Sequence, residues 1–305
     1  MPMRPSRFLR FGSVPTSEVA VNVNTQPRSA LGTYLAGATL ARLADEGVRI
    51  AFVLLAVERT GSATFGALLV AALLIPHVVA APIIGGLADR MRRRSHFQAI
   101  VLAVFSLCIA LCSALVGYTA EWIIIIIAVV GGCAGPILTG GLTSLVSDIV
   151  PESDRERAYG LDNVTYTSAG IGGPSIAGFL GSMLNAGIAT LTLAISAGIA
   201  ALIVLELPIA RKIDAAHPPL RFSSVFSLRG ISPLWTSRTL RGVTIASTIG
   251  TAGTAAVPLA VVLLSEHMYS SSMVGFFLTA FALGGLTGSL LYAHHPFGTS
   301  NTDFG

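Results

Sequence analysis

The sequence predicts an all-α membrane protein with a complete N-terminal six-helix bundle and the first two helices of a second bundle. Two observations lead to this fold class. The 305 residues are 53% hydrophobic and only 11% charged, whereas a soluble domain carries about 25% charged residues. Apolar segments of roughly 20 residues, the length that a helix needs to span a bilayer, also recur along the chain.

Eight apolar segments are the predicted membrane spans, and the polar stretches between them divide the chain. The spans cover about 31–57, 62–85, 97–117, 122–147, 158–183, 186–207, 243–264 and 273–293. The predicted parts are a cytoplasmic tail (1–29), a six-helix bundle (30–207), a basic cytoplasmic linker (208–242), a partial second bundle of two spans (243–293) and a polar tail (294–305).

The charges of the connecting segments alternate, and this pattern predicts the orientation. Of the 19 basic residues, 16 lie in segments that share one side of the membrane, and only Arg59 lies on the other. Because cytoplasmic loops carry the excess of Lys and Arg, the N-terminus is expected in the cytoplasm. Basic residues in short loops do not form a nucleic-acid-binding face, so no nucleic acid partner is expected.

Four charged residues lie near the middle of the first span: Arg42, Asp45, Glu46 and Arg49. Each unpaired charge there costs about 2.5–3.5 kcal/mol. Arg42 is expected to reach Asp45 and Glu46 at i+3 and i+4, and Arg49 reaches the same acids from the other side. One hypothesis is that Asp45 or Glu46 takes up a proton during transport. The alternative is a fixed ion-pair network that sets helix packing.

Other polar residues of the apolar segments give weaker indications. His77 follows Pro76 in the second span, where it would carry protons, contact a substrate or bond to a carbonyl freed by the proline. Asp162 and Glu206 lie near span ends, where water is expected to reach them, and no role is assigned to them. Three cysteines lie in apolar runs without the spacing of a metal site. No metal or cofactor is expected.

The stretch GGLADRMRRRSHF, residues 85–97, gathers one acid and four arginines after the second span. It is predicted to be a cytoplasmic loop of about ten residues, and retention of the loop inside accounts for the arginines at 92–94. Retention by basic residues does not account for the acidic residue Asp89. The stretch resembles the loop between spans 2 and 3 of the major facilitator superfamily of secondary transporters, with matches at Gly85, Asp89, Arg90, Arg93 and Arg94, and with Arg92 where the family usually has glycine.

This resemblance implies a role for the loop. In the superfamily the Asp–Arg pair forms a cytoplasmic latch between the two six-helix bundles and helps to set the balance between inward-open and outward-open states. Asp89 and Arg90 are the matching pair in this chain. An Asp that accepts from a helix N-terminus, ordered by an Arg, suits such a latch.

The fifth span, GLDNVTYTSAGIGGPSIAGF, resembles a glycine–proline pattern of the exporter branch of the superfamily. Two of the pattern's glycines are alanines here, and the matching residues are Gly160, Ala169, Gly173, Pro174, Ala177 and Gly178. Small residues permit close helix approach and proline bends a helix, which suits a moving interface. Ordinary small-residue packing is the alternative.

The resemblance implies a function and an environment. We expect a secondary active transporter in a bacterial inner membrane that exports a drug-like compound or a siderophore by alternating access, driven by protons. Its partners would be the lipid bilayer, the small molecule and protons. The spans contain no nucleophile–base constellation and the chain no phosphate-binding loop, so neither an enzyme nor an ATP-driven pump is expected.

Family members usually have twelve spans, and this chain has eight predicted ones. A truncated gene product is the favoured explanation, and a second chain that supplies the remaining helices or a genuinely short protein are the alternatives. The alternative function is a non-transporting membrane scaffold or assembly partner.

Overall fold

The computed structural model describes residues 26–91, 93–208, 237–250, 253, 280–281 and 283–291. In these parts the secondary structure is helical, and no strand occurs among them. The principal helices are α1 (Gln26–Thr60), α2 (Ala63–Arg90), α3 (Arg94–Leu115), α4 (Glu121–Gly132), α7 (Arg155–Met183) and α8 (Ala186–Leu205). The all-α fold class is confirmed.

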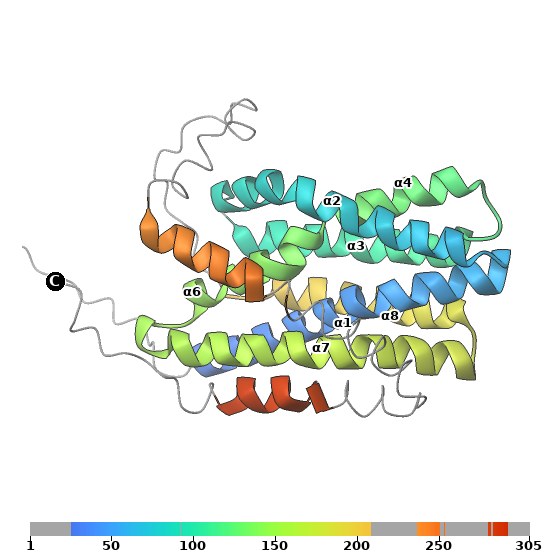
Figure 1. Ribbon diagram of the computed structural model, residues 1–305. Helices are drawn as coiled ribbons and strands as arrows, with labels where there is room; N and C mark the ends of the chain where they lie inside the picture. Colours follow the sequence, from blue (N-terminus) through green and yellow to red (C-terminus); the bar gives the residue numbers. More distant parts are fainter. Residues whose placement is uncertain are drawn as a thin grey trace, which may run out of the picture.

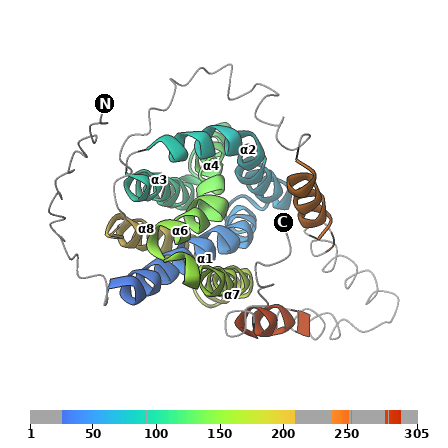
Figure 2. The same ribbon diagram turned by 90° about the vertical axis from the view of Figure 1, so that its left-hand side faces the viewer.

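The helices pack as one bundle with α1 at its centre. Helix α1 packs most extensively against α7 and α8 and also against α2, while α3 packs against α8 and α4. Figure 1 shows α2, α3 and α4 on one side of α1 and α7 on the other, and Figure 2 shows the same arrangement along the helix axes. Every helix of the bundle therefore lies against at least two others.

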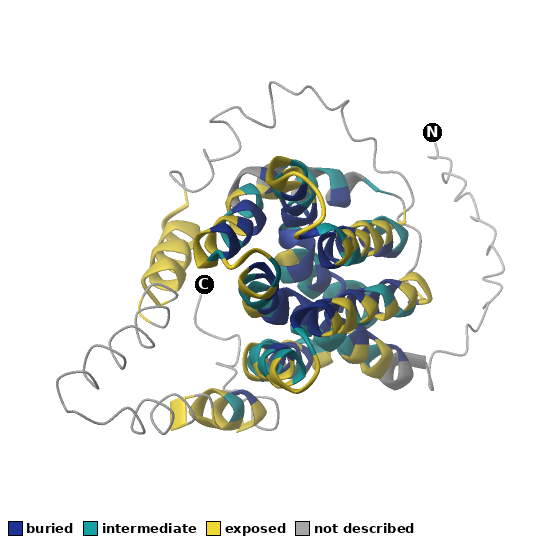
Figure 3. Cartoon of the chain, turned by 90° about the vertical axis from the view of Figure 1, so that its right-hand side faces the viewer, coloured by how far each residue is buried: buried dark blue, intermediate teal, exposed yellow. Residues whose placement is uncertain are grey.

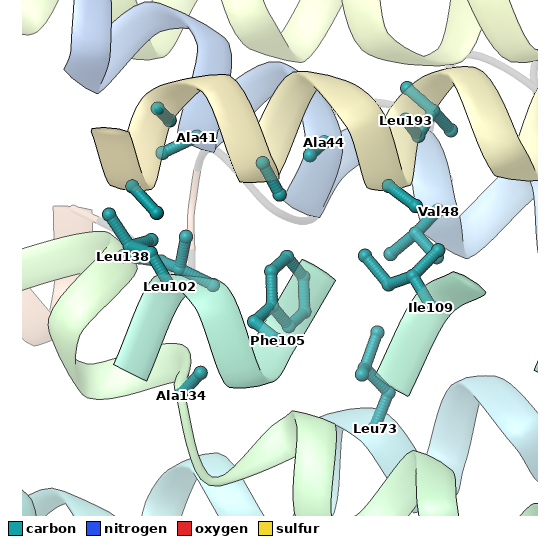
Figure 4. Packing of buried hydrophobic residues seen from close by; sticks show 14 of the residues in the cluster. Ala41, Ala44, Val48, Leu73, Leu102, Phe105, Ile109, Ala134, Leu138 and Leu193 are labelled. Carbon is teal, nitrogen blue, oxygen red and sulfur yellow. The ribbon is translucent and has the colours of Figure 1, made fainter. Parts of the chain in front are cut away.

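Small residues on α1 and α8 make this close packing possible. The buried face of α1 repeats at three- and four-residue steps and includes Ala38, Ala41, Ala44 and Val48, all with 0% exposure. Side chains from α3 fill the space beside them, with Phe105 at the centre of the cluster in Figure 4. Membrane helices associate through such close van der Waals contact, since lipid is as apolar as leucine.

The outer faces of the bundle are apolar. Exposed Ile, Leu and Val side chains lie on α3, α4 and α8, and Figure 3 shows the exposed residues facing outward around a buried interior. Within the part of the chain that the structure describes, three segments are long and apolar enough to cross a membrane: Arg94–Leu115, Glu121–Ile149 and Ala186–Leu205. An apolar surface of this kind is the one that a bilayer solvates.

The fourth predicted span, 122–147, lies in the membrane-crossing segment Glu121–Ile149, but its helix is interrupted. Helix α4 ends at Gly132, and the chain continues as a π-helix, η1 (Ile137–Gly141), followed by α5 (Leu142–Ser144) and α6 (Val146–Ile149). The break coincides with the sequence GGCAGP. Glycine weakens a helix interior, and Pro136 offers no backbone N–H and clashes with the preceding turn.

Two connections at one end of the bundle are fixed by side chains. The Ser62 hydroxyl caps α2 by accepting from the Phe65 amide at 3.1 Å, and Asn185 caps α8 by accepting from the Ile188 amide at 2.7 Å. Glu58 reaches from the end of α1 to accept from the Ala186 amide at 2.6 Å. These bonds satisfy amides that a helix N-terminus leaves without partners.

The remaining predicted parts are described only in pieces. Residues 238–250 are helical and exposed, and helix is also present at 280–281 and 283–291. The tail at 1–25, most of the predicted linker (209–236) and the polar tail at 294–305 lie outside the described residues. The predicted tail extended to residue 29, whereas α1 begins at Gln26.

Candidate functional site

The bundle interior contains a buried ion pair between α1 and α7. Arg42 Nη1 donates to Asp162 Oδ1 at 2.7 Å, and the two side chains are 3% and 4% exposed. Nη2 of Arg42 donates to the other oxygen, Oδ2, at 3.3 Å. Two charges buried this deeply offset their desolvation only when geometry and further hydrogen bonds are good.

The further hydrogen bonds are present. The Tyr34 hydroxyl donates to Asp162 Oδ1 at 2.6 Å, and the Thr143 hydroxyl donates to Oδ2 at 2.8 Å. The Arg42 guanidinium also donates to Thr165 Oγ1 and, at 3.4 Å, to the Leu138 carbonyl. Each oxygen of the Asp162 carboxylate thus accepts at least two hydrogen bonds. These bonds offset the desolvation of the buried pair.

This pairing corrects two sequence predictions. Arg42 was expected to bond to Asp45 and Glu46 on its own helix, but it reaches across to Asp162 on α7 instead. Asp162 was expected near water at a span end and received no role. It lies only seven residues into α7, about 10 Å along the helix axis, yet neighbouring helices cover it.

The second cluster of charges forms as predicted around Arg49. Its guanidinium bonds to Asp45 Oδ2 at 2.6 Å and to Glu46 Oε2 at 2.8 Å, at i−4 and i−3 on α1. The Asp45 side chain is 7% exposed, and those of Glu46 and Arg49 are 34% and 30% exposed. The four charges of the first span therefore belong to two separate clusters, one around Arg42 and one around Arg49.

His77 lies at the break in the fourth span. Its imidazole fills the position that a Cβ at Gly135 would take, and it lines a cavity of about 380 Å³ with Thr139 and Ser144. The ring therefore packs against the break in the fourth span, and the roles predicted for His77 from the sequence stay predictions. The structure does not assign it a transport role.

The charged stretch after the second span is shorter as a loop than the ten residues expected. Helix α2 continues to Arg90 and α3 begins at Arg94, so Asp89 and Arg90 lie in the last turn of a helix. The side chains of Asp89 and Arg90 and the burial of Gly85 are outside the described part, as is the whole of residue 92. The predicted latch pair is therefore placed by its backbone alone.

The two remaining basic residues of the predicted latch lie at the start of α3. Arg93 is exposed and has its Nη1 3.3 Å from His96 Nε2. Arg94 Nη1 pairs with Asp148 Oδ2 on α6 at 3.2 Å. Arg94 thus ties α3 to the end of the fourth span within the same bundle.

The small-residue pattern of α7 falls largely on its buried face. Gly160, Ala169, Gly173 and Ala177 are all buried, whereas Pro174 and Gly178 are only partly buried. Pro174 lies inside α7 without ending it. A Cβ at Gly173 would overlap the backbone of Gly47 and Leu43 on α1, so close helix packing requires a small residue at this position.

Comparison with known proteins decides the family. The profile of the Major Facilitator Superfamily matches residues 34–296, which is most of the chain. The chain belongs to the Major Facilitator Superfamily. Its membership makes it a multi-pass membrane protein, in agreement with the apolar outer face of the bundle.

A curated relative supports the same assignment. The chain is 25% identical over 270 residues to an uncharacterized MFS-type transporter, y4rN, of Sinorhizobium fredii (strain NBRC 101917 / NGR234). The matched region is 87% of this superfamily member and 66% of the relative. The chain thus spans about two thirds of the length of that relative.

Sequence reasoning missed the uncharged members of the buried network, which are Tyr34, Thr143, Thr165 and Tyr166. Hydroxyl side chains occur throughout membrane helices, so their presence alone gives no signal. The sequence did contain a signal at Asp162, because an acidic residue within an apolar helix requires a partner. No group of three His, Cys, Asp or Glu side chains that could hold a metal ion occurs within the described segments.

Proposed function

We propose that this chain acts in secondary active transport, as a proton-coupled exporter of a drug-like small molecule or siderophore by alternating access. The bacterial inner membrane, with the N-terminus in the cytoplasm, is its proposed location. Family membership supports membrane transport in general. The observation that supports proton coupling is the charge balance of the bundle interior.

That balance differs between the two clusters. Arg42 and Asp162 neutralise each other. Arg49 faces two carboxylates, Asp45 and Glu46, so this cluster carries one excess negative charge when both are ionised. One proton removes the excess, and the low dielectric around a membrane-spanning helix favours the neutral state. The second cluster is therefore the proposed proton site.

The experiment is accumulation of ethidium and of the neutral dye 7-hydroxy-4-methylcoumarin in bacterial cells that express the 305-residue chain. We expect expression to lower the accumulation of at least one dye, and a protonophore to abolish the effect. Asp45→Asn combined with Glu46→Gln removes both carboxylates of the proposed proton site and should abolish the effect as well. Glu121→Gln, which alters an exposed carboxylate in the first turn of α4, is the matched control and should retain export.

Two outcomes would contradict the proposal. If neither dye is exported by the wild-type chain, export of this class of molecule is wrong. If protonophore-sensitive export survives in the double variant, the coupling proton binds elsewhere. Expression of each variant in the membrane is measured by immunoblot, so that loss of protein is separated from loss of export.

The latch proposal concerns Asp89 and Arg90 at the end of α2. Their place in the last turn leaves a short connection to α3, which suits a contact with a second bundle. We propose that Asp89→Asn shifts the balance between inward-open and outward-open states. One pair of cysteines is placed across the two bundles at the cytoplasmic face and a second pair at the outer face. The yield of the disulfide in each pair measures that balance, and an unchanged balance would exclude the latch.

A further inference from the structure

A polar cavity of about 500 Å³ lies between the fourth span and α7, lined by Gly140, Thr143, Ser144, Tyr159, Asp162, Asn163 and Tyr166. Its volume lies within the range of small-molecule sites. We propose that this cavity binds an uncharged, flat, hydrogen-bonding ring of the transported molecule, with Tyr166, Tyr159 and Thr143 as contact residues. The inference rests on the proposed function, because it names the chemical class of the substrate.

The charge of the cavity wall excludes charged ligands. Among its described lining residues only Asp162 carries a formal charge, and Arg42 neutralises it at 2.7 Å. The carboxylate oxygens already accept from Tyr34, Arg42 and Thr143. A cationic ligand would have to displace these donors, and an anionic one would have to take Arg42 from Asp162. Either exchange leaves a buried charge without its partner, which is costly.

The aromatic wall favours a flat ring. The guanidinium carbon of Arg42 lies 3.5 Å from the ring centroid of Tyr166, so the ion pair holds this ring in place. The Tyr166 hydroxyl is 3.4 Å from Thr143 Oγ1. Tyr159, which is 39% exposed, supplies a second aromatic side chain about two helical turns away on α7. A ring fixed before binding stacks on a ligand with little loss of conformational entropy.

The rest of the wall is matched to neutral hydrogen-bonding groups. Thr143, Ser144 and Asn163 present hydroxyl and amide groups. The Thr143 and Ser144 hydroxyls already donate to Asp162 Oδ2 and to the Gly141 carbonyl, so their oxygens accept from a ligand hydroxyl, whereas the side-chain amide of Asn163 offers both donor and acceptor atoms. A few polar groups on an otherwise uncharged surface orient a ligand without selecting its charge. The ring and these groups together define the ligand class.

The cavity also adjoins the contact with the helix at 283–291. Asn163 Nδ2 donates to Ser289 Oγ at 2.7 Å, and Tyr159 and Asn163 line a neighbouring cavity with Gly284, Gly285 and Gly288. This helix lies beside α7 in Figures 1 and 2. A ligand in the cavity therefore lies next to the described contact between the two bundles.

The test uses three dyes that share one ring and differ in charge. They are 7-hydroxy-4-methylcoumarin, its cationic 4-aminomethyl analogue and its anionic 4-acetic acid analogue, at a mildly acidic pH where the ring hydroxyl keeps its proton. Fluorescence anisotropy measures their binding to the purified 305-residue chain in detergent. We expect the neutral dye to bind about tenfold more tightly than either charged one.

Substitutions in the cavity wall test where the neutral dye binds. Tyr166→Leu should weaken binding of the neutral dye about tenfold, while Tyr166→Phe, which keeps the ring, should change it less than about threefold. Tyr118→Leu is the matched control, since Tyr118 is 78% exposed on the α3–α4 connection, and should leave binding unchanged. If Tyr166→Leu fails to fold, Tyr159→Leu, at a partly exposed position, replaces it with the same expected direction.

Three results overturn the inference: equal binding of all three dyes, tighter binding of a charged dye, or neutral-dye binding that is independent of Tyr166 and Tyr159. The absence of any dye binding overturns it too. Protonophore-sensitive ethidium export without neutral-dye binding would reject the substrate class and leave transport standing. Neutral-dye binding that depends on Tyr166, without export of any dye, would reject transport and leave the site standing.

Discussion

Gly47 on α1 and Gly173 on α7 meet backbone to backbone. A Cβ at Gly173 would lie 2.7 Å from the Gly47 amide nitrogen, and a Cβ at Gly47 would lie 2.8 Å from the Gly173 carbonyl oxygen. Neither atom is the end of a flexible side chain, so no rotamer change relieves the overlap. The two glycines permit the close crossing of α1 and α7, and Arg42 reaches Asp162 elsewhere along this pair of helices.

Gly173→Ala is therefore expected to destabilise the bundle. The added methyl forces α1 and α7 apart, at a cost of about 1–3 kcal/mol, which lowers the melting temperature in detergent by about 5 °C. Gly178→Ala on the same helix is the matched control, because a Cβ there meets nothing within 4 Å. It should be neutral or slightly stabilising, since alanine favours helix. Equal melting temperatures for the two variants would contradict the close approach of α1 and α7 at Gly173.

The Arg42–Asp162 pair is expected to act as a unit. Asp162→Asn or Arg42→Met alone leaves a buried charge without its partner and should cost about 3–5 kcal/mol, or about 10 °C in melting temperature. The double variant removes both charges and should recover most of that loss. A double-mutant cycle of melting temperatures measures the coupling. Additive losses would show that the two charges do not depend on each other.

The sequence predicted the spans well and the partners of their charges poorly, for a physical reason. A run of about 20 apolar residues is a property of one segment, so α3 and α8 begin and end within a few residues of the predictions. The Arg49 pairs are also local, at three and four residues along α1. The partner of Arg42 depends on how α1 and α7 are rotated against each other, and no single segment encodes that rotation.

The break in the fourth span illustrates the same limit. Its glycines and Pro136 weaken a helix locally. Hydropathy averaged over a long apolar run does not show that weakness. What the break accommodates is the His77 ring from α2. Only the packing of two spans reveals it. The latch pair at Asp89 and Arg90 stays a prediction.

Gly135→Ala tests the contact between His77 and the break. The new methyl group competes with the imidazole for the same space, so a loss of about 1–3 kcal/mol is expected. His77→Ala vacates that space, and the double variant should therefore be more stable than the sum of the single losses predicts. Melting temperatures of the four proteins measure this coupling. A strictly additive result would place His77 away from Gly135.

Arg59 is expected to stabilise one end of the bundle. Its Nη1 donates to the carbonyls of Ser113 at 2.6 Å and Val116 at 3.1 Å, where α3 ends and its last carbonyls lack helical partners. Arg59→Ala should cost about 1–2 kcal/mol through these lost bonds. Glu121→Ala, at an exposed position in the first turn of α4, is the control and should change the melting temperature little. Similar losses in both variants would exclude a specific role for Arg59.

The proposed orientation is tested by labelling the two ends of the bundle. Tyr118, between α3 and α4, and Glu152, in η2 (Glu152–Asp154), are both exposed. The α3–α4 connection and the α6–α7 connection, which contains η2, lie at opposite ends of the bundle in Figure 1. Each is replaced by cysteine in a chain whose three native cysteines are changed to serine. With a cytoplasmic N-terminus, a membrane-impermeant maleimide should label Tyr118→Cys in intact cells and Glu152→Cys only after the membrane is opened. The reverse pattern would invert the topology, and with it the side of the membrane on which Asp89 and Arg90 lie.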